Sequence, residues 1–169
     1  SKDAAVWDHL GIARRQAAQY EAAEQSFKRS LVLEPLRPKT WVNLGNLQLD
    51  QAQAEKAIIS FQRALVLKPD FFEAHNNLGN ALTVCRQFAA ASTSFHDALR
   101  IRPDLAEAHS NLGNTQKDLG LFDAAIASYQ QALRLKPNLA EAHSGLARVL
   151  IDRGQTEATR PKRSRPGYE

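Results

Sequence analysis

Amide side chains recur at a fixed interval along this sequence, and they are its most distinctive chemical groups. Seven of the eight asparagines fall into three groups that are 34 residues apart. A side-chain amide offers both a hydrogen-bond donor and an acceptor, which match the C=O and N–H groups of a peptide backbone. The groups are Asn43 and Asn46; Asn76, Asn77 and Asn80; and Asn111 and Asn114. This spacing predicts a row of amides that could hold another polypeptide by its main chain.

Three histidines recur at the same interval, in a pattern that argues against a metal site. His75, His109 and His143 occur once in each interval. If each interval folds as one structural unit, successive histidines lie about 10 Å apart, whereas zinc ligands lie about 2 Å from a shared ion. We therefore expect these side chains to pack within the fold, and we expect no metal and no cofactor.

The remaining reactive side chains do not form the pattern of a catalytic site. His9 and His96 have no sequence-visible partner for a nucleophile–base pair. The glycines of the NLGN segments are expected inside helices, whereas a phosphate-binding loop places its glycines before a helix. The single cysteine, Cys85, is expected to be a small buried side chain. The sequence therefore predicts a protein that is not an enzyme.

Charge and composition disfavour a nucleic-acid partner and a membrane span. The net charge of the 169 residues is +4, but residues 153–169 alone contribute +3, with five basic and two acidic residues. The rest of the chain is close to neutral, whereas a nucleic-acid-binding domain carries a basic face. No apolar run approaches the roughly 18 residues of a membrane helix. The hydrophobic content of 43% is sufficient for a buried core.

Cysteine and methionine usage bears on the compartment and on the length of the natural chain. One cysteine cannot form an internal disulfide, which fits a reducing compartment such as the cytoplasm. The sequence has no methionine, so we expect the natural start to lie upstream and the sequence to be part of a longer chain.

Apolar residues recur in steps of three and four, as expected for amphipathic helices. One such face runs from Trp41 to Leu47 and a second from Ala57 to Leu65, so each 34-residue unit is predicted to form two helices. A single unit cannot bury its apolar side, so neighbouring units must stack. Prolines are predicted to end each unit, and N-caps to begin the next. The predicted N-caps are Asp70, Asp104 and Asn138, each three residues before a glutamate.

The whole pattern resembles the tetratricopeptide repeat family. Each full unit contains an aromatic residue or histidine, then Leu-Gly, then alanine, an aromatic residue and a final proline. The resemblance implies an all-α, right-handed superhelix that acts as a protein-binding module. Four repeats are expected at about residues 4–37, 38–71, 72–105 and 106–139, with a partial fifth at 140–155 and a basic, proline-containing tail at 156–169.

The asparagine-bearing units are most similar to the repeats of O-linked N-acetylglucosamine transferases, in which an asparagine ladder holds the substrate chain. The resemblance implies that the first asparagine position (Asn43, Asn77, Asn111) forms the ladder, beside the second asparagine position (Asn46, Asn80, Asn114). The first unit has His9 and Ile12 at these positions and the fifth has Gly145 and Arg148. An alternative function is therefore the substrate-recognition arm of a larger glycosyltransferase, whose catalytic domain has no counterpart in these residues.

Charged residues on the same helix face predict the charge of the ligand. Similarity to the family implies that the first helix of each repeat lines a concave groove. Acidic residues on this face favour an extended peptide with basic side chains and disfavour a terminal carboxylate. Beside the seven asparagines, the predicted groove residues are Glu73, Glu107, Asp50, Asp118 and Arg148.

Two further interpretations remain open from the sequence. In the first, the asparagines bond across to neighbouring helices and fix the repeat geometry, since buried amides need partners. In the second, the chain self-associates as a scaffold. The incomplete fifth unit is expected to leave Val149 and Ile151 exposed to a second copy, or the basic tail to lie in the acidic groove of a neighbour.

Overall fold

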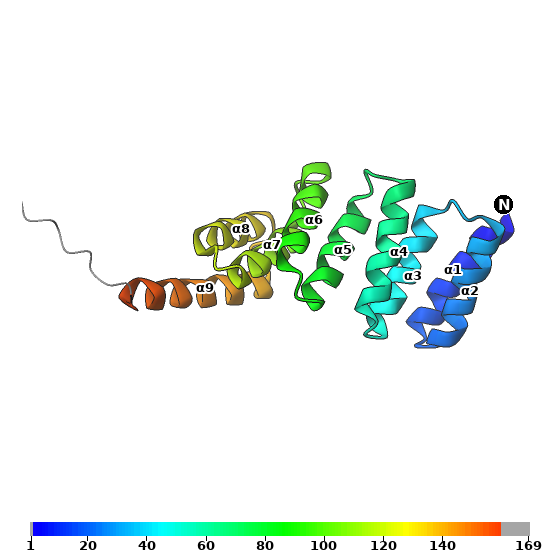
Figure 1. Cartoon of the computed structure of the whole chain (residues 1–169), viewed down its shortest axis with the longest axis horizontal. Coiled ribbons are helices and arrows are strands. Elements are labelled where there is room, and N and C mark those ends of the chain that lie inside the picture. The colour runs from blue at the N-terminus through cyan, green and yellow to red at the C-terminus, as the bar shows by residue number, and fades with distance from the viewer. Residues whose placement is uncertain (1, 160–169) are drawn as a thin grey trace, which may run out of the picture.

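The computed structural model describes residues 2–159, which fold entirely into α-helices and short connections (Figure 1). This confirms the predicted all-α repeat superhelix. The helices are α1 (Lys2–Gln16), α2 (Tyr20–Leu33), α3 (Pro38–Asp50), α4 (Ala54–Leu67), α5 (Phe72–Val84), α6 (Phe88–Ile101), α7 (Ala106–Asp118), α8 (Phe122–Leu135) and α9 (Ala140–Thr159).

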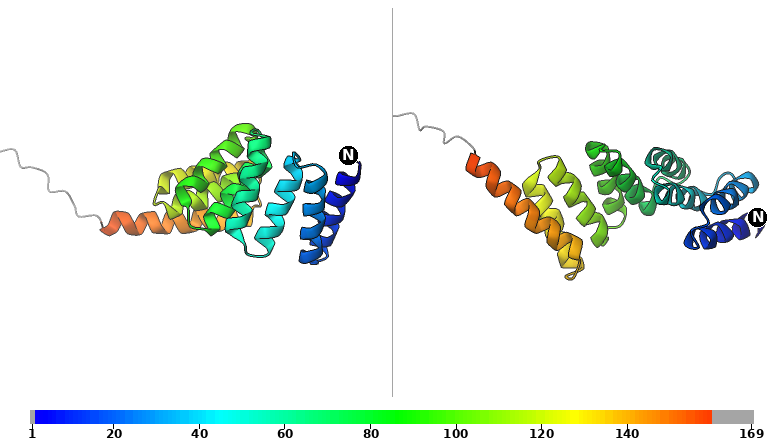
Figure 2. Two further views of the ribbon diagram at one scale, coloured as in Figure 1. Left: turned by 45° about the vertical axis from the view of Figure 1, so that its right-hand side comes forward. Right: turned by 90° about the horizontal axis from the view of Figure 1, so that it is seen from below.

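The helices pack as successive antiparallel pairs along the long axis of the molecule (Figure 2). Helices α1, α3, α5 and α7 each pack mainly on the even-numbered helix that follows, whereas α9 packs mainly on α8, which precedes it. Consecutive odd-numbered helices are in contact only to a small extent. Helix α9 has 20 residues, compared with 13 in α7, and it continues past residue 155 to Thr159. The predicted tail therefore begins inside a helix, and residues 160–169 lie outside the described part of the chain.

An aromatic ring fills the centre of each helix pair because a glycine faces it. Phe61 is fully buried, and a Cβ atom added to Gly45 would lie 2.6 Å from its ring. The same relation holds for the rings and glycines of the other three pairs. The ring therefore occupies the space that a methyl group on the glycine would take.

The turn inside each helix pair uses one residue in the left-handed conformation. Ala52 has φ of +56°, and the N–H of Gln53 then bonds to the carbonyl of Gln48 at 2.8 Å. This pattern ends a helix by satisfying its last carbonyl groups. Equivalent residues in the other pairs are Ala18, Arg86 and Gly120, and only the last is glycine.

The predicted N-caps are wrong. Helix α5 begins at Phe72, so the capping residue is the buried Phe71 rather than the exposed Asp70, and its side chain makes no capping bond. Burial of an apolar residue at this position outweighs a polar cap. A ring-to-carbonyl bond secures the connection instead, because His75 Nε2 lies 2.8 Å from the Pro69 carbonyl oxygen. His109, His143 and Trp41 make the same bond to the preceding proline carbonyl.

Candidate functional site

Four small hollows open along the odd-numbered helices, and we call this surface the odd-helix face. One is lined by α1, α3 and α5, one lies between α5 and α7, and two lie between α7 and α9. Nine of the twelve predicted site residues line these hollows, while Asn80, Asp50 and Asp118 lie outside them on the same helices. The largest hollow has a volume of ≈ 400 Å³ and the smallest ≈ 220 Å³. None of these hollows is the single deep cavity that encloses a small molecule.

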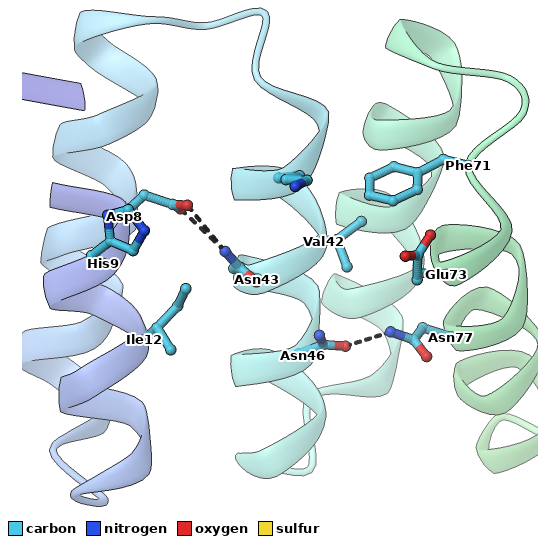
Figure 3. A pocket seen from close by; sticks show the side chains of 10 residues that line it. Asp8, His9, Ile12, Val42, Asn43, Asn46, Phe71, Glu73 and Asn77 are labelled. Atoms are coloured by element: carbon cyan, nitrogen blue, oxygen red, sulfur yellow. Dashed lines mark hydrogen bonds between the residues drawn. The ribbon is translucent and has the colours of Figure 1, made fainter. Parts of the chain in front are cut away.

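The asparagines of neighbouring repeats bond to each other in pairs. Asn77 Nδ2 on α5 donates to Asn46 Oδ1 on α3 at 2.8 Å (Figure 3). One repeat later, Asn111 Nδ2 donates to Asn80 Oδ1 at 2.9 Å. The first asparagine position of each repeat thus donates to the second asparagine position of the repeat before it. We call these two units the amide pairs.

Asn43, at the N-terminal end of the face, makes a different hydrogen bond, because the first repeat has no asparagine that could accept from it. Ile12 occupies that position, and Asn43 Nδ2 instead donates to the two carboxylate oxygens of Asp8, at 3.2 and 3.3 Å (Figure 3). Asp8 is only 6% exposed. The amide therefore supplies a hydrogen bond to a carboxylate that is largely withdrawn from water.

At the C-terminal end a tyrosine replaces the missing partner. Gly145 stands at the first asparagine position of the fifth repeat, so Asn114 has no amide to accept from. The hydroxyl of Tyr129 donates to Asn114 Oδ1 at 2.6 Å instead. The ring of Tyr129 lies so close to Gly113 and Gly145 that neither position has room for a Cβ atom.

Each amide pair still has groups that the helix stack does not use. Within the described residues, Asn46 Nδ2, Asn80 Nδ2 and Asn111 Oδ1 have no hydrogen-bond partner in the protein, and all three side chains are half-buried. The Nδ2–Oδ1 bond inside each amide pair agrees with the interpretation that the asparagines fix the repeat geometry. That bond uses only one donor and one acceptor of each pair. The two remaining donors and the remaining acceptor are not buried.

Two buried polar atoms on the same face have no hydrogen-bond partner in the part of the chain that the structure describes. They are Asn76 Oδ1 and Ser110 Oγ, which occupy equivalent positions in α5 and α7. Asn76 Nδ2 donates to Asn77 Oδ1 at 3.2 Å, so only its oxygen is unsatisfied. Ser110 is 2% exposed and lines the hollow between α7 and α9.

Ion pairs engage part of the predicted acidic lining. Asp50 pairs with Arg15 of the preceding repeat, and Asp118 pairs with its neighbour Lys117. Glu107 lies 2.7 Å from Lys136. A hydrogen bond from Lys136 is the main cause that lowers the pKa of Glu107, and the same bond raises the pKa of Lys136. Lys136 follows α8, so the sequence pattern of the first helices, from which the groove residues were predicted, did not include it.

Charges change sign at the C-terminal end of the face. Arg148 lines the last hollow together with Lys117, Asn114 and Glu141. By contrast, Glu73 and Glu141 form no ion pair among the described residues. The acidic character of the odd-helix face is therefore concentrated on α5, α7 and the start of α9.

The predicted exposure of Val149 is wrong, whereas that of Ile151 is confirmed. Val149 is 0% exposed because it packs in the core with Tyr129 and Ala132. Ile151 is 61% exposed and the adjacent Leu150 is 44% exposed. Leu150 aligns with buried residues of the earlier repeats, which could have identified it from the sequence.

Other candidate chemistry finds little support in the part of the chain that the structure describes. Residues 2–159 contain no cluster of three or more histidine, cysteine or acidic side chains able to hold a metal. None of the nine helices there has the length and apolarity to cross a bilayer. Cys85 follows α5 and is half-buried rather than buried, and burial together with Glu55 raises the pKa of its thiol.

Comparisons with known proteins agree with this architecture. Two sequence models match, one described as tetratricopeptide repeat over residues 106–139 and one described as TPR repeat over residues 49–83. No curated protein matches the chain.

Solved structures of the same fold extend the likeness over most of the chain. MamA from Desulfovibrio magneticus RS-1 is 19% identical with a TM-score of 0.85, and the match covers 94% of this chain and 89% of that one. TTC0263, described as a thermophilic TPR protein in Thermus thermophilus, is 25% identical with a TM-score of 0.72, covering 91% and 84%. The Cut9–Hcn1 complex gives 22% identity, a TM-score of 0.78, and coverage of 85% and 29%.

Proposed function

The chain belongs to the tetratricopeptide repeat family, and from that premise we propose that it binds a partner polypeptide in extended conformation along the odd-helix face. The repeats make it a protein–protein interaction module, and we propose that it has no catalytic role of its own. One observation carries the proposal: each amide pair uses one donor and one acceptor within the stack, and the remaining amide atoms of Asn46, Asn80 and Asn111 are neither bonded to other described residues nor buried.

The amide pairs would bind the main chain of the ligand rather than its side chains. Asn46 Nδ2 and Asn80 Nδ2 would donate to backbone carbonyls, and Asn111 Oδ1 would accept from a backbone N–H. Their mutual hydrogen bonds hold the amides in place before binding, which lowers the conformational entropy lost on association. Each new bond contributes about 0.5–1.5 kcal/mol net, so we expect weak binding that tolerates many sequences.

A peptide-array screen tests this proposal with a variant that spares the stack. Replacing Asn46 and Asn80 by aspartate keeps the oxygen that accepts from Asn77 or Asn111 but removes the outward N–H donors. The double variant should fold normally and lose binding to neutral peptides across the array. Retention of the full binding pattern by this variant would remove the main-chain mechanism. Glu21→Gln on α2 provides a control away from the odd-helix face.

A substrate-recognition arm of a larger glycosyltransferase would use the same row of amides. The asparagine pattern raised this alternative, and the open reading frame that encodes the chain tests it. A glycosyltransferase domain in the same reading frame would support it, and its absence there would leave the stand-alone interaction module.

Self-association is a second candidate function, favoured by the exposed face of α9. No helix among the described residues follows α9, so Leu150 and Ile151 lack the cover that the second helix gives in the other repeats. Ultracentrifugation over a range of concentrations tests this. Ile151→Lys should abolish any self-association, whereas Val84→Lys, at a residue that is 67% exposed on α5, should not. The predicted role of the basic tail falls mainly on residues outside the described part of the chain.

A further inference from the structure

Two adjacent hollows on the odd-helix face share one design. Glu73 and Glu107 lie at the same position in successive repeats and line the hollow that contains Asn76. Glu107 and Glu141, again one repeat apart, line the hollow that contains Ser110. Glu107 belongs to both hollows, so three glutamates frame two neighbouring sites, which we call the glutamate-framed hollows.

Both hollows hold a buried polar atom that has no hydrogen-bond partner within residues 2–159. Ser110 Oγ is buried in a residue that is 2% exposed, and Asn76 Oδ1 is likewise buried and unsatisfied. A buried acceptor without a donor is unfavourable, because it has lost its hydrogen bonds to water without replacement. The two atoms occupy equivalent positions of α5 and α7, so the same missing hydrogen bond occurs in two successive repeats. A ligand that brings hydrogen-bond donors would supply both bonds.

The charges around these hollows specify a cationic donor. Glu73 and Glu141 have no ion-pair partner among the described residues, and Glu107 has only Lys136. The charge of Glu141 also contributes, in smaller part, to the raised pKa of Lys136. Arg102 lies 4.5 Å from the centre of the Phe72 ring and pairs with Asp104. Three further cations line the two other hollows: Lys39 shares one of them with Glu73, and Lys117 and Arg148 share the other with Glu141. Lys136 thus already places one cation beside the second hollow.

We propose that the glutamate-framed hollows bind two arginine side chains of the partner polypeptide. The inference rests on the proposed function, since the same extended ligand supplies both side chains. Arginine fits better than lysine because its planar guanidinium carries five N–H donors, enough to reach a glutamate carboxylate and a neighbouring amide or hydroxyl oxygen together.

The repeat spacing sets the distance between the two arginines. First helices of adjacent repeats lie about 10 Å apart. A polyproline II segment advances about 9.3 Å over three residues and returns to the same face at that point. The ligand therefore carries arginines three residues apart, in the pattern Arg-x-x-Arg.

The ends of the odd-helix face limit this preference to the middle. The first hollow combines the apolar side chains of Ile12, Val42 and Phe71 with charged ones. Lys39 is a competing cation there, Asp8 already accepts hydrogen bonds from Asn43, and Glu73 also lines the first glutamate-framed hollow. The fourth hollow also lies between α7 and α9 and shares Glu141 with the second glutamate-framed hollow, but it contains Lys117 and Arg148, which repel a further cation. Arginines placed beyond the two glutamate-framed hollows gain nothing.

Fluorescence anisotropy with labelled alanine-based peptides and the full chain tests the proposal. The probe has two arginines three residues apart, and matched peptides carry glutamine at both positions or arginines two or four residues apart. Replacing both arginines by glutamine should weaken binding about tenfold at low salt. Altered spacing should lose most of the benefit of the second arginine.

Protein variants locate the effect. Glu107→Gln should remove most of the arginine preference because both hollows use this residue. Lys136→Gln should strengthen binding of the arginine peptide a fewfold, because it removes the competing internal cation. Glu21→Gln should leave both affinities unchanged. If all variants bind the arginine peptide equally, the hollows are not the arginine sites.

The outcomes separate this inference from the proposed function. Equal affinity of the wild-type chain for the arginine and glutamine peptides overturns the arginine sites. If Asn46→Asp with Asn80→Asp still weakens both peptides, main-chain recognition stands without them. Failure of every peptide to bind contradicts both proposals.

Discussion

The phenol of Tyr129 donates a 2.6 Å hydrogen bond to Oδ1 of Asn114, and thereby takes the role that an asparagine of the following repeat plays elsewhere. In the two preceding repeats the equivalent rings are Phe61 and Phe95, which have no hydroxyl group. There Asn77 donates to Asn46 Oδ1, and Asn111 donates to Asn80 Oδ1. The fifth repeat has Gly145 at that position, which also leaves room for the tyrosine ring. The tyrosine and the glycine thus act together to keep the last amide oriented.

Removal of this hydroxyl should destabilise the C-terminal repeats. Tyr129→Phe keeps the ring packing but removes the hydrogen bond to Asn114, so we expect a loss of about 1 kcal/mol in the free energy of unfolding. Urea denaturation measures it. Phe95→Tyr serves as the converse control, because Asn80 already accepts from Asn111. If Tyr129→Phe is as stable as the wild type, the hydroxyl does not hold Asn114.

The same residue predicts a stability change at high pH. Burial raises the pKa of Tyr129 from 10.0 to about 12. Between these values the unfolded chain loses the phenolic proton while the folded chain keeps it, so stability falls as pH rises. The slope from this group is about 1.4 kcal/mol per pH unit. Denaturation at a series of pH values from about 9 to about 12 should show a shallower fall for Tyr129→Phe, and identical slopes would contradict the assignment.

Glycine at the helix crossing should resist replacement, in contrast to glycine elsewhere in a helix. A Cβ atom at Gly45 would lie 2.6 Å from the Phe61 ring, so Gly45→Ala should cost about 1–3 kcal/mol from overpacking. Gly154 in α9 has open space around it, and Gly154→Ala should stabilise by up to about 1 kcal/mol. Thermal denaturation of the two variants should give shifts of opposite sign, and a stabilised Gly45→Ala variant would contradict the packing.

Turn residues offer a route to a more stable chain. Ala52 adopts φ of +56°, a conformation in which a side chain is unfavourable. Ala52→Gly should therefore stabilise by about 0.5–1 kcal/mol, after allowing for the greater entropy of glycine in the unfolded chain. Ala127→Gly in the middle of α8 is the control and should destabilise by about 1 kcal/mol. Destabilisation by both substitutions would show that the turn does not favour glycine.

A double-mutant cycle should detect the hydrogen bond inside an amide pair. Asn46→Ala and Asn77→Ala each remove the same bond, so their effects on stability should not add. We expect a coupling energy of about 0.5–1.5 kcal/mol from chemical denaturation. The cycle of Asn46 with Asn111, which share no bond, should give a value near zero. Coupling that is no larger in the first cycle than in the second would argue against the pair.

The repeat architecture was predictable from the sequence because it depends on periodic features. The 34-residue interval, the apolar steps and the Gly–aromatic match each indicate local packing that every repeat reproduces. The N-caps were not predictable in this way, since Asp70 fits a general capping rule while the repeat buries Phe71 and ties its connection through His75. Burial of Phe71 against other helices therefore determines where α5 begins.

The site was predictable in its location but not in its hydrogen bonding. All seven predicted asparagines lie on odd-numbered helices, as the helical periodicity required. The side chain of Asn77 could either face a ligand or bond to Asn46 in the preceding repeat. The relative position of the two repeats decides between these, and it cannot be read from the sequence of one helix. The ion pair between Glu107 and Lys136 joins residues 29 apart in different elements, so the repeat pattern gave no signal for it.

Titration calorimetry of the double variant Asn46→Asp, Asn80→Asp with a neutral array-selected peptide tests main-chain recognition most directly. This variant keeps the oxygens that accept from Asn77 and Asn111 and loses the outward donors. We predict at least about a tenfold weaker affinity than that of the wild type, from the loss of two hydrogen bonds, with an unchanged thermal midpoint. Unchanged affinity in a variant that folds as stably as the wild type would contradict the account.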